Sequence, residues 1–112
     1  MQIRKLLVLV LLGLSLTAAA DFKTTTEVYE IDLPNLRLPA SEGGTLALKE
    51  CDDCEVLTLR VSAGTRYVLN HRDVTLVEFK KGISRVTNRE NVIVDVAHHL
   101  ASDSVTAVMV KL

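Results

Sequence analysis

The sequence predicts a small all-β domain, an antiparallel barrel or sandwich of about six or seven short strands that follows a cleaved signal peptide. Three observations predict this fold class. Beyond residue 20, short runs rich in Val, Leu, Thr and Ile recur at intervals of roughly ten residues and alternate with turn-forming residues. No stretch of that region has the apolar spacing of a long amphipathic helix. Residues 21–112 suffice for a single domain with one modest core.

Residues 1–20 have the three parts of a secretory signal peptide. Arg4 and Lys5 supply the positive charge, and an apolar segment follows at residues 6–16. Three alanines end the leader at Ala20, so we expect cleavage between Ala20 and Asp21. A membrane-spanning helix needs roughly 20 apolar residues, and this apolar segment is shorter. We therefore expect export to the periplasm or to the outside of the cell, with no stable membrane anchor after cleavage.

Seven segments of the mature chain have the composition of strands. In chain order they are residues 27–33, 45–50, 55–61, 66–70, 74–79, 91–97 and 105–111. The intervening residues include Pro, Gly, Asn, Asp and Ser, which favour turns. The segments 74–79 and 105–110 are apolar on both faces, which predicts central strands or a closed barrel.

Three pairs of neighbouring segments can be aligned as antiparallel hairpins with apolar side chains opposite each other. The alignments place Leu48 opposite Leu57, Leu69 opposite Val74, and Val96 opposite Val105. Because side chains alternate along a strand, a shift of one residue would move all of these groups to the solvent face. The three alignments together predict a meander of antiparallel strands.

Residues 91–100 fit either a strand or a helix, and we expect a strand. In favour of a helix, Val92, Val96 and Leu100 lie on one stripe of a helical surface, and Asn88 could cap its N-terminus. However, the Val-Ile-Val run that begins at Val92 is β-branched throughout, and such residues are enriched in strands.

Cys51 and Cys54, the two cysteines of the chain, stand at the ends of a four-residue turn. The first and last Cα atoms of such a turn lie within about 7 Å of each other. Disulfides need Cα separations of about 4.4–6.8 Å, and they persist in the oxidising compartments outside the cytoplasm. We therefore expect a structural disulfide. Its stabilisation is on the order of 2 kcal/mol, because the loop that it closes is short.

A redox-active dithiol is one alternative for this turn. In thiol oxidoreductases a Cys-x-x-Cys motif begins a helix, whose N-terminus lowers the thiol pKa. Here strands are expected on both sides, and Glu50, Asp52, Asp53 and Glu55 surround the sulfurs with negative charge that disfavours a thiolate. Haem attachment would need His directly after the second Cys, and Glu55 occupies that position.

A metal site is the other alternative. Two thiolates from Cys51 and Cys54 together with an imidazole would suit zinc or copper. The available imidazoles are those of His71, His98 and His99. His98 and His99 are adjacent, so on a strand they point to opposite faces and do not both reach one ion. The sequence also has only one pair of cysteine ligands, whereas zinc motifs usually combine two pairs.

The charge pattern argues against nucleic acid as a partner. Without the leader, 11 Lys and Arg residues stand against 14 Asp and Glu residues, a net charge of about −3. A nucleic-acid surface combines a basic stripe with stacking aromatic side chains, and this chain has two Tyr, two Phe and no Trp. A mild basic run of Lys80, Lys81, Arg85 and Arg89 is expected to be a solvated loop, with contact to an anionic envelope polymer left open.

We expect a non-catalytic exported β module that binds another envelope component, a protein or a polymer, and needs no cofactor. No nucleophile–base motif or other catalytic set stands out in the sequence. A periplasmic metal-binding protein is the second hypothesis, and a thiol–disulfide oxidoreductase is the third. If the segment 105–111 lies at a sheet edge, its backbone could pair with a strand of a partner or of a second copy.

Mass spectrometry of the protein from its producing cells tests the leader and the disulfide together. We expect a chain that begins at Asp21, because signal peptidase accepts small side chains such as those of Ala18 and Ala20. We also expect a mass lower than that of the reduced chain by two hydrogens. A cytosolic chain that keeps residues 1–20 would contradict export.

Overall fold

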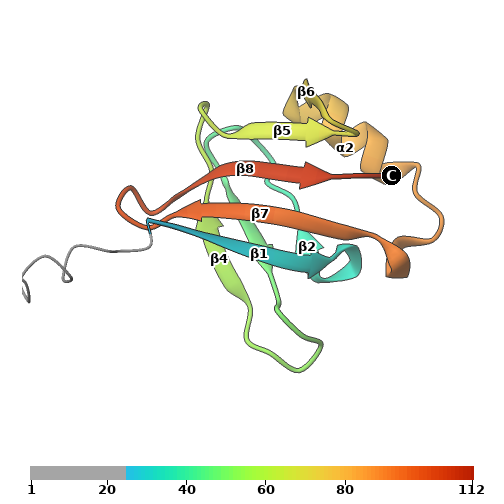
Figure 1. The fold of residues 1–112 in the computed structure, drawn as a ribbon, viewed down its shortest axis with the longest axis horizontal. Coiled ribbons are helices and arrows are strands. Elements are labelled where there is room, and N and C mark those ends of the chain that lie inside the picture. The colour runs from blue at the N-terminus through green and yellow to red at the C-terminus, as the bar shows by residue number, and fades with distance from the viewer. Residues whose placement is uncertain (1–24) are drawn as a thin grey trace, which may run out of the picture.

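The computed structural model describes residues 25–112, so the predicted signal peptide, residues 1–20, and its cleavage site lie outside the described residues (Figure 1). The described residues form eight strands, one α-helix and two short 3-10 helices. In chain order these are β1 (Thr26–Asp32), η2 (Leu33–Asn35), β2 (Leu36–Arg37), β3 (Thr45–Leu48), β4 (Leu57–Arg60), β5 (Arg66–Leu69), β6 (Arg72–Val74), α2 (Leu76–Ser84), η3 (Arg89–Asn91), β7 (Ile93–His99) and β8 (Ser104–Val110). Within residues 25–112 no helix has the length and apolar character needed to cross a membrane.

The larger sheet has five strands in the order β1-β7-β8-β5-β6. Its neighbouring strands are antiparallel, except that β5 and β8 run parallel. The C-terminal strand β8 therefore lies inside the sheet, between β7 and β5. This position agrees with the central strand predicted for residues 105–110. It also removes the route to association through an edge at residues 105–111, because the two edges are β1 and β6.

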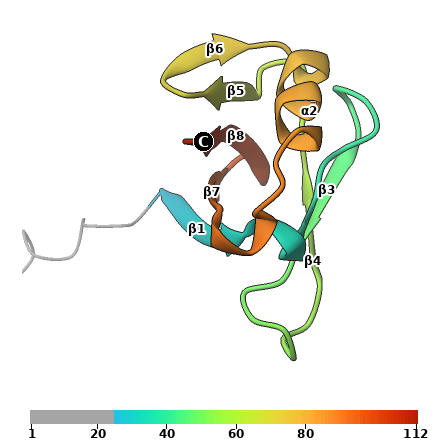
Figure 2. The ribbon, with the colours of Figure 1, turned by 90° about the vertical axis from the view of Figure 1, so that its right-hand side faces the viewer.

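The smaller sheet has three strands in the order β2-β3-β4. Figure 2 shows that β3, β4 and α2 all lie on the same side of the five-stranded sheet. The fold is thus mostly β, as predicted, but the described residues form two sheets and a helix, and the sheets do not close into a barrel. The all-β prediction missed the helix that shares the covering layer with the small sheet.

The core lies between the five-stranded sheet and the layer formed by α2 and the small sheet. Phe79 of α2 is fully buried, and its ring centroid lies 5.5 Å from that of Tyr67 on β5. Burial, together with the charge of Glu42, raises the pKa of the Tyr67 hydroxyl. Further core side chains come from both sheets, from α2 and from the segments that connect them: Ile31, Leu33, Leu36, Leu46, Leu48, Leu59, Val61, Leu76, Ile83, Val92, Val94, Val96, Val105, Val108 and Val110.

The prediction of a strand at residues 74–79 is wrong, because α2 begins at Leu76. Thr75 is its N-cap: the Thr75 hydroxyl accepts a hydrogen bond from the Glu78 backbone N–H at 3.1 Å. The Glu78 carboxylate in turn accepts from the Thr75 backbone N–H at 3.3 Å, which completes a capping box. Leu76, Phe79 and Ile83 recur at helical spacing and form the buried face.

One of the three predicted strand registers is confirmed. Leu48 pairs with Leu57, whereas Val74 pairs with Tyr67 and Val96 pairs with Val108. The β5–β6 hairpin is tighter than predicted, because residues 70 and 71 both adopt positive φ angles, as a two-residue turn requires. The β7–β8 register differs because β7 continues to residue 99 and contains an irregularity after residue 97. The strand expected within residues 91–100 is confirmed by β7.

Replacing the N-cap tests the importance of the helix start. Thr75→Ala is expected to lower the free energy of unfolding by about 1 kcal/mol, because the Glu78 N–H loses its acceptor. Thr75→Ser retains a hydroxyl, so its effect should be less than about 0.5 kcal/mol. Urea denaturation of both variants measures the difference, and equal losses would contradict the role of the capping box.

Candidate functional site

The loop of residues 49–56 joins β3 to β4 and carries the cysteine pair. Cys51 and Cys54 form a disulfide with a Cα–Cα distance of 5.0 Å, which confirms the predicted bond. The Cys54 N–H donates to the Cys51 carbonyl at 3.2 Å, so the bond closes a turn at the tip of the loop. The loop projects from the body of the domain at the bottom of Figure 1.

The base of this loop is fixed against η2. The Lys49 N–H donates to the Asn35 carbonyl at 3.0 Å, and the Asn35 side-chain amide donates to Asp52 at 3.2 Å. The cysteines lie between two strands, with no helix beginning at Cys51 whose N-terminus could lower a thiol pKa. The surroundings therefore suit a structural disulfide better than a redox-active dithiol.

His98 lies in the interior of the domain. The residue is only 7% exposed, and its Nε2 donates to Asp103 Oδ1 at 2.9 Å. Asp103 reaches this position from the β7–β8 turn, where it adopts a φ of 50° that Asp tolerates better than most residues. This hydrogen bond ties the end of β7 to the turn that follows it.

The other two histidines lie apart from His98 and from the disulfide. His99 is half-buried, and its Nδ1 lies 2.8 Å from the Ser102 hydroxyl. His71 belongs to the β5–β6 turn, next to the C-terminal end of β8, whereas His98 pairs with Val105 near the start of β8. The candidate ligands are therefore not brought together, and both sulfurs are held in the disulfide. Among residues 25–112 no group of three or more His, Cys, Asp or Glu could hold a metal ion.

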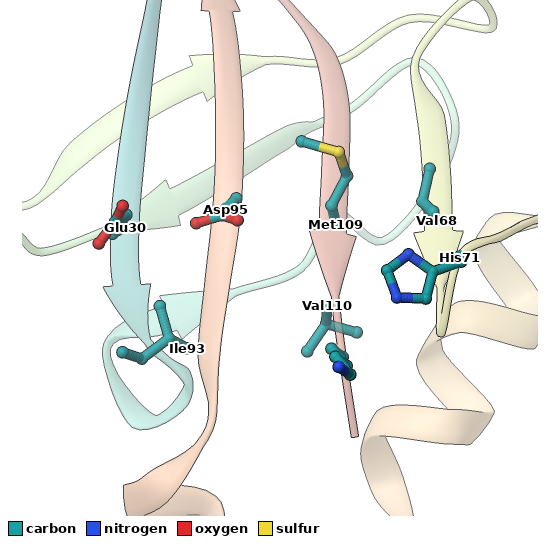
Figure 3. Close-up of a pocket in the computed structure, with 8 residues that line it drawn as sticks. Glu30, Val68, His71, Ile93, Asp95, Met109 and Val110 are labelled. Carbon is teal, nitrogen blue, oxygen red and sulfur yellow. The ribbon is translucent and has the colours of Figure 1, made fainter.

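The outer face of the five-stranded sheet, opposite the core, carries a row of side chains that crosses four strands. Glu30 pairs with Asp95, Asp95 with Met109, and Met109 with Val68, so these four residues stand side by side. Figure 3 shows them on β1, β7, β8 and β5, with His71 beyond the last of them. They line an open hollow of about 410 Å³. None of the other described elements covers this face in Figure 2.

Exposed apolar groups accompany the carboxylates on the outer face. Val28 is 58% exposed and Ile93 is 53% exposed, and both belong to the β1–β7 pair. Glu30 and Asp95 are directly opposite each other, an arrangement of like charges that is unfavourable in an isolated sheet. A cation placed over this pair would offset the repulsion, while Val28 and Ile93 would offer apolar contact.

Negative charge also lies on the inner side of the β1 edge. The Tyr29 hydroxyl donates to the Glu27 carboxylate at 2.8 Å. This hydrogen bond, together with some burial and the charges of Glu27 and Glu50, raises the pKa of Tyr29. Glu50 belongs to the disulfide loop, so the loop adds its charge to that of the β1 edge.

Basic residues gather at the opposite edge of the sheet, on and after α2 and on β6. Lys80 donates to the Pro39 carbonyl at 3.1 Å, and Arg89 donates to the Ile83 carbonyl at the end of α2 at 3.3 Å. All four residues of the basic run are exposed, as expected for solvated side chains, but the expectation of a loop is wrong for Lys80 and Lys81, which belong to α2. Figure 1 places α2 and β6 at the top, with β1 and the disulfide loop below.

Comparisons with protein-family models, with curated proteins and with solved structures found no match to this chain. The candidate site therefore depends on the geometry alone. It comprises the outer face of the five-stranded sheet and the adjoining β1 edge.

This surface was not predicted from the sequence, although the residues of β1 carry part of the pattern that indicates it. In β1 the acidic residues Glu27, Glu30 and Asp32 flank apolar positions, which is unusual for a strand buried on both faces. The row from Glu30 to Val68 joins residues from four distant segments, so it emerges only when the strand order is known.

Removing the disulfide tests its structural role. The double variant Cys51→Ser, Cys54→Ser is expected to fold and to lose roughly 2 kcal/mol of unfolding free energy, because the unfolded chain regains the entropy of a short loop. Asp53→Asn changes the same exposed turn without breaking the bond, and its effect should stay within about 0.5 kcal/mol. Urea denaturation under non-reducing conditions measures both, and an unchanged double variant would contradict a stabilising bond.

Proposed function

We propose that the protein is exported, loses residues 1–20 and acts as a small non-catalytic module that binds another component of the cell envelope. The observation that carries this proposal is the open outer face of the five-stranded sheet, where exposed Val28 and Ile93 adjoin the carboxylates of Glu30 and Asp95. Contiguous exposed apolar groups are typical of surfaces that meet a partner, and polar groups commonly surround them.

The disulfide supports the exported location within this proposal. Bonds such as Cys51–Cys54 persist in oxidising compartments and are rare in the cytosol. The leader predicted at residues 1–20 is a feature independent of the disulfide, and it indicates the same exported location. A domain of this size outside the cell gains from a covalent closure, since its hydrophobic core is small.

Site-specific photo-crosslinking in the producing cells tests the binding role. A photoreactive amino acid replaces Ile93 on the outer face, and in a matched control it replaces Val77, which is 67% exposed on α2. We expect a discrete adduct from position 93, in the fraction outside the cytoplasm, and none from position 77. Equal labelling from the two positions, labelling from neither, or a cytosolic protein would contradict the proposal.

A further inference from the structure

We propose that the β1 edge accepts an extended cationic segment of a partner protein as a sixth strand of the large sheet. This inference rests on the proposed binding function and deepens it by naming the site and the chemistry of the partner. It starts from the backbone of β1, which within the described residues pairs with β7 on one side only.

The hydrogen bonds at the two ends of the β1–β7 pair show which backbone groups of β1 are not bonded to β7. The Leu100 N–H donates to the Thr25 carbonyl, and the Leu33 N–H donates to the Val92 carbonyl, both at 2.9 Å. In an antiparallel pair every second residue bonds to the neighbouring strand. The backbone N–H and C=O groups of the odd-numbered residues of β1 therefore form hydrogen bonds with β7. Thr26, Val28 and Glu30 turn their N–H and C=O groups toward the open edge.

Apart from its charged side chains, β1 lacks the features that usually protect a sheet edge. Such edges are commonly short, contain Pro or Lys, or are twisted by a bulge. β6, at the other edge, has three residues, whereas β1 has seven, and these contain no Pro and no basic residue. All seven pair with β7 in an unbroken register. β1 is thus regular and long enough to align another strand.

The charges of β1 oppose pairing with a second copy of the chain. Glu27, Glu30 and Asp32 give the strand three carboxylates and no cation. Antiparallel pairing of two β1 strands would bring six carboxylates to one seam, and like charges on adjacent strands are destabilising. The same charges attract a strand that carries Lys or Arg, so they select against self-association while leaving the edge open to a cationic partner.

Carboxylates reach both faces of the incoming strand. On the outer face Glu30 and Asp95 stand next to each other. On the inner side Glu27 lies within hydrogen-bonding distance of Tyr29, near the charge of Glu50. A partner segment with several basic residues, free of Pro and at least about six residues long, fits these requirements. Its backbone would supply affinity, and its basic side chains would supply specificity.

The test uses a synthetic peptide with blocked ends, Lys-Val-Lys-Thr-Lys-Val-Lys, and its acidic counterpart, in which Glu replaces each Lys. Fluorescence anisotropy measures binding to the mature protein with its disulfide intact. We expect the basic peptide to bind, with a Kd that rises with salt, and the acidic peptide not to bind. Equal binding of the two peptides would overturn the charge argument.

Val28→Pro removes one outward N–H and is matched by Val28→Ala, which keeps it. Proline is tolerated on an edge strand where its missing N–H faces solvent, so the variant should retain the fold. We expect the Kd of the basic peptide to be about tenfold higher for Val28→Pro than for Val28→Ala, because both variants lose the valine side chain and only the proline variant loses the N–H. Equal values for the two variants would overturn strand addition.

Amide hydrogen exchange of the unmodified protein gives a second measurement that does not depend on the folding of the proline variant. Saturation with the basic peptide should slow exchange at Val28 and Glu30 and leave Tyr29, which already bonds to β7, unchanged. The proposal would be overturned if amide exchange slowed over the whole acidic surface, or if it did not slow at β1. The photo-crosslink from position 93 remains a separate result, so a general binding role can survive failure of the β1 edge.

Discussion

Burial of one face of the five-stranded sheet is the constraint on which the rest of the structure depends. Phe79 and Ile83 of α2, with Leu46 and Leu59 of the small sheet, fill the space against that face. A sheet is stable only when at least one face is packed against another layer. The described chain supplies one helix and three short strands for this purpose, and they all lie on the same side. The described residues leave the other face and the β1 edge uncovered.

The same layering separates charge along the sheet. Basic side chains lie on and around α2 and β6, while carboxylates occupy β1, position 95 and the disulfide loop, where Lys49 is the single cation. The disulfide holds the acidic turn of residues 51–54 in place, a role that is independent of its modest effect on stability.

The sequence analysis predicted part of the local structure but not the order of the strands. The Leu48–Leu57 register, the disulfide and a strand within residues 91–100 each follow from neighbouring residues. The helix α2 was missed because its apolar residues were matched to a strand, although the Thr-Leu-Val-Glu run that begins at Thr75 is a capping-box signal. The burial of His98 was missed because its partner, Asp103, reaches it only through the geometry of the β7–β8 turn.

By itself the sequence determined a mostly β domain, a central strand near residues 105–110 and a closed cysteine turn, because side-chain periodicity and short loops encode these locally. Only the tertiary structure decided the strand order, the parallel pairing of β5 with β8 and the identity of the open edge. Those features join segments far apart in the chain. The strand order and pairing that form are those that bury the most apolar surface in the complete domain, so they are a property of the whole fold.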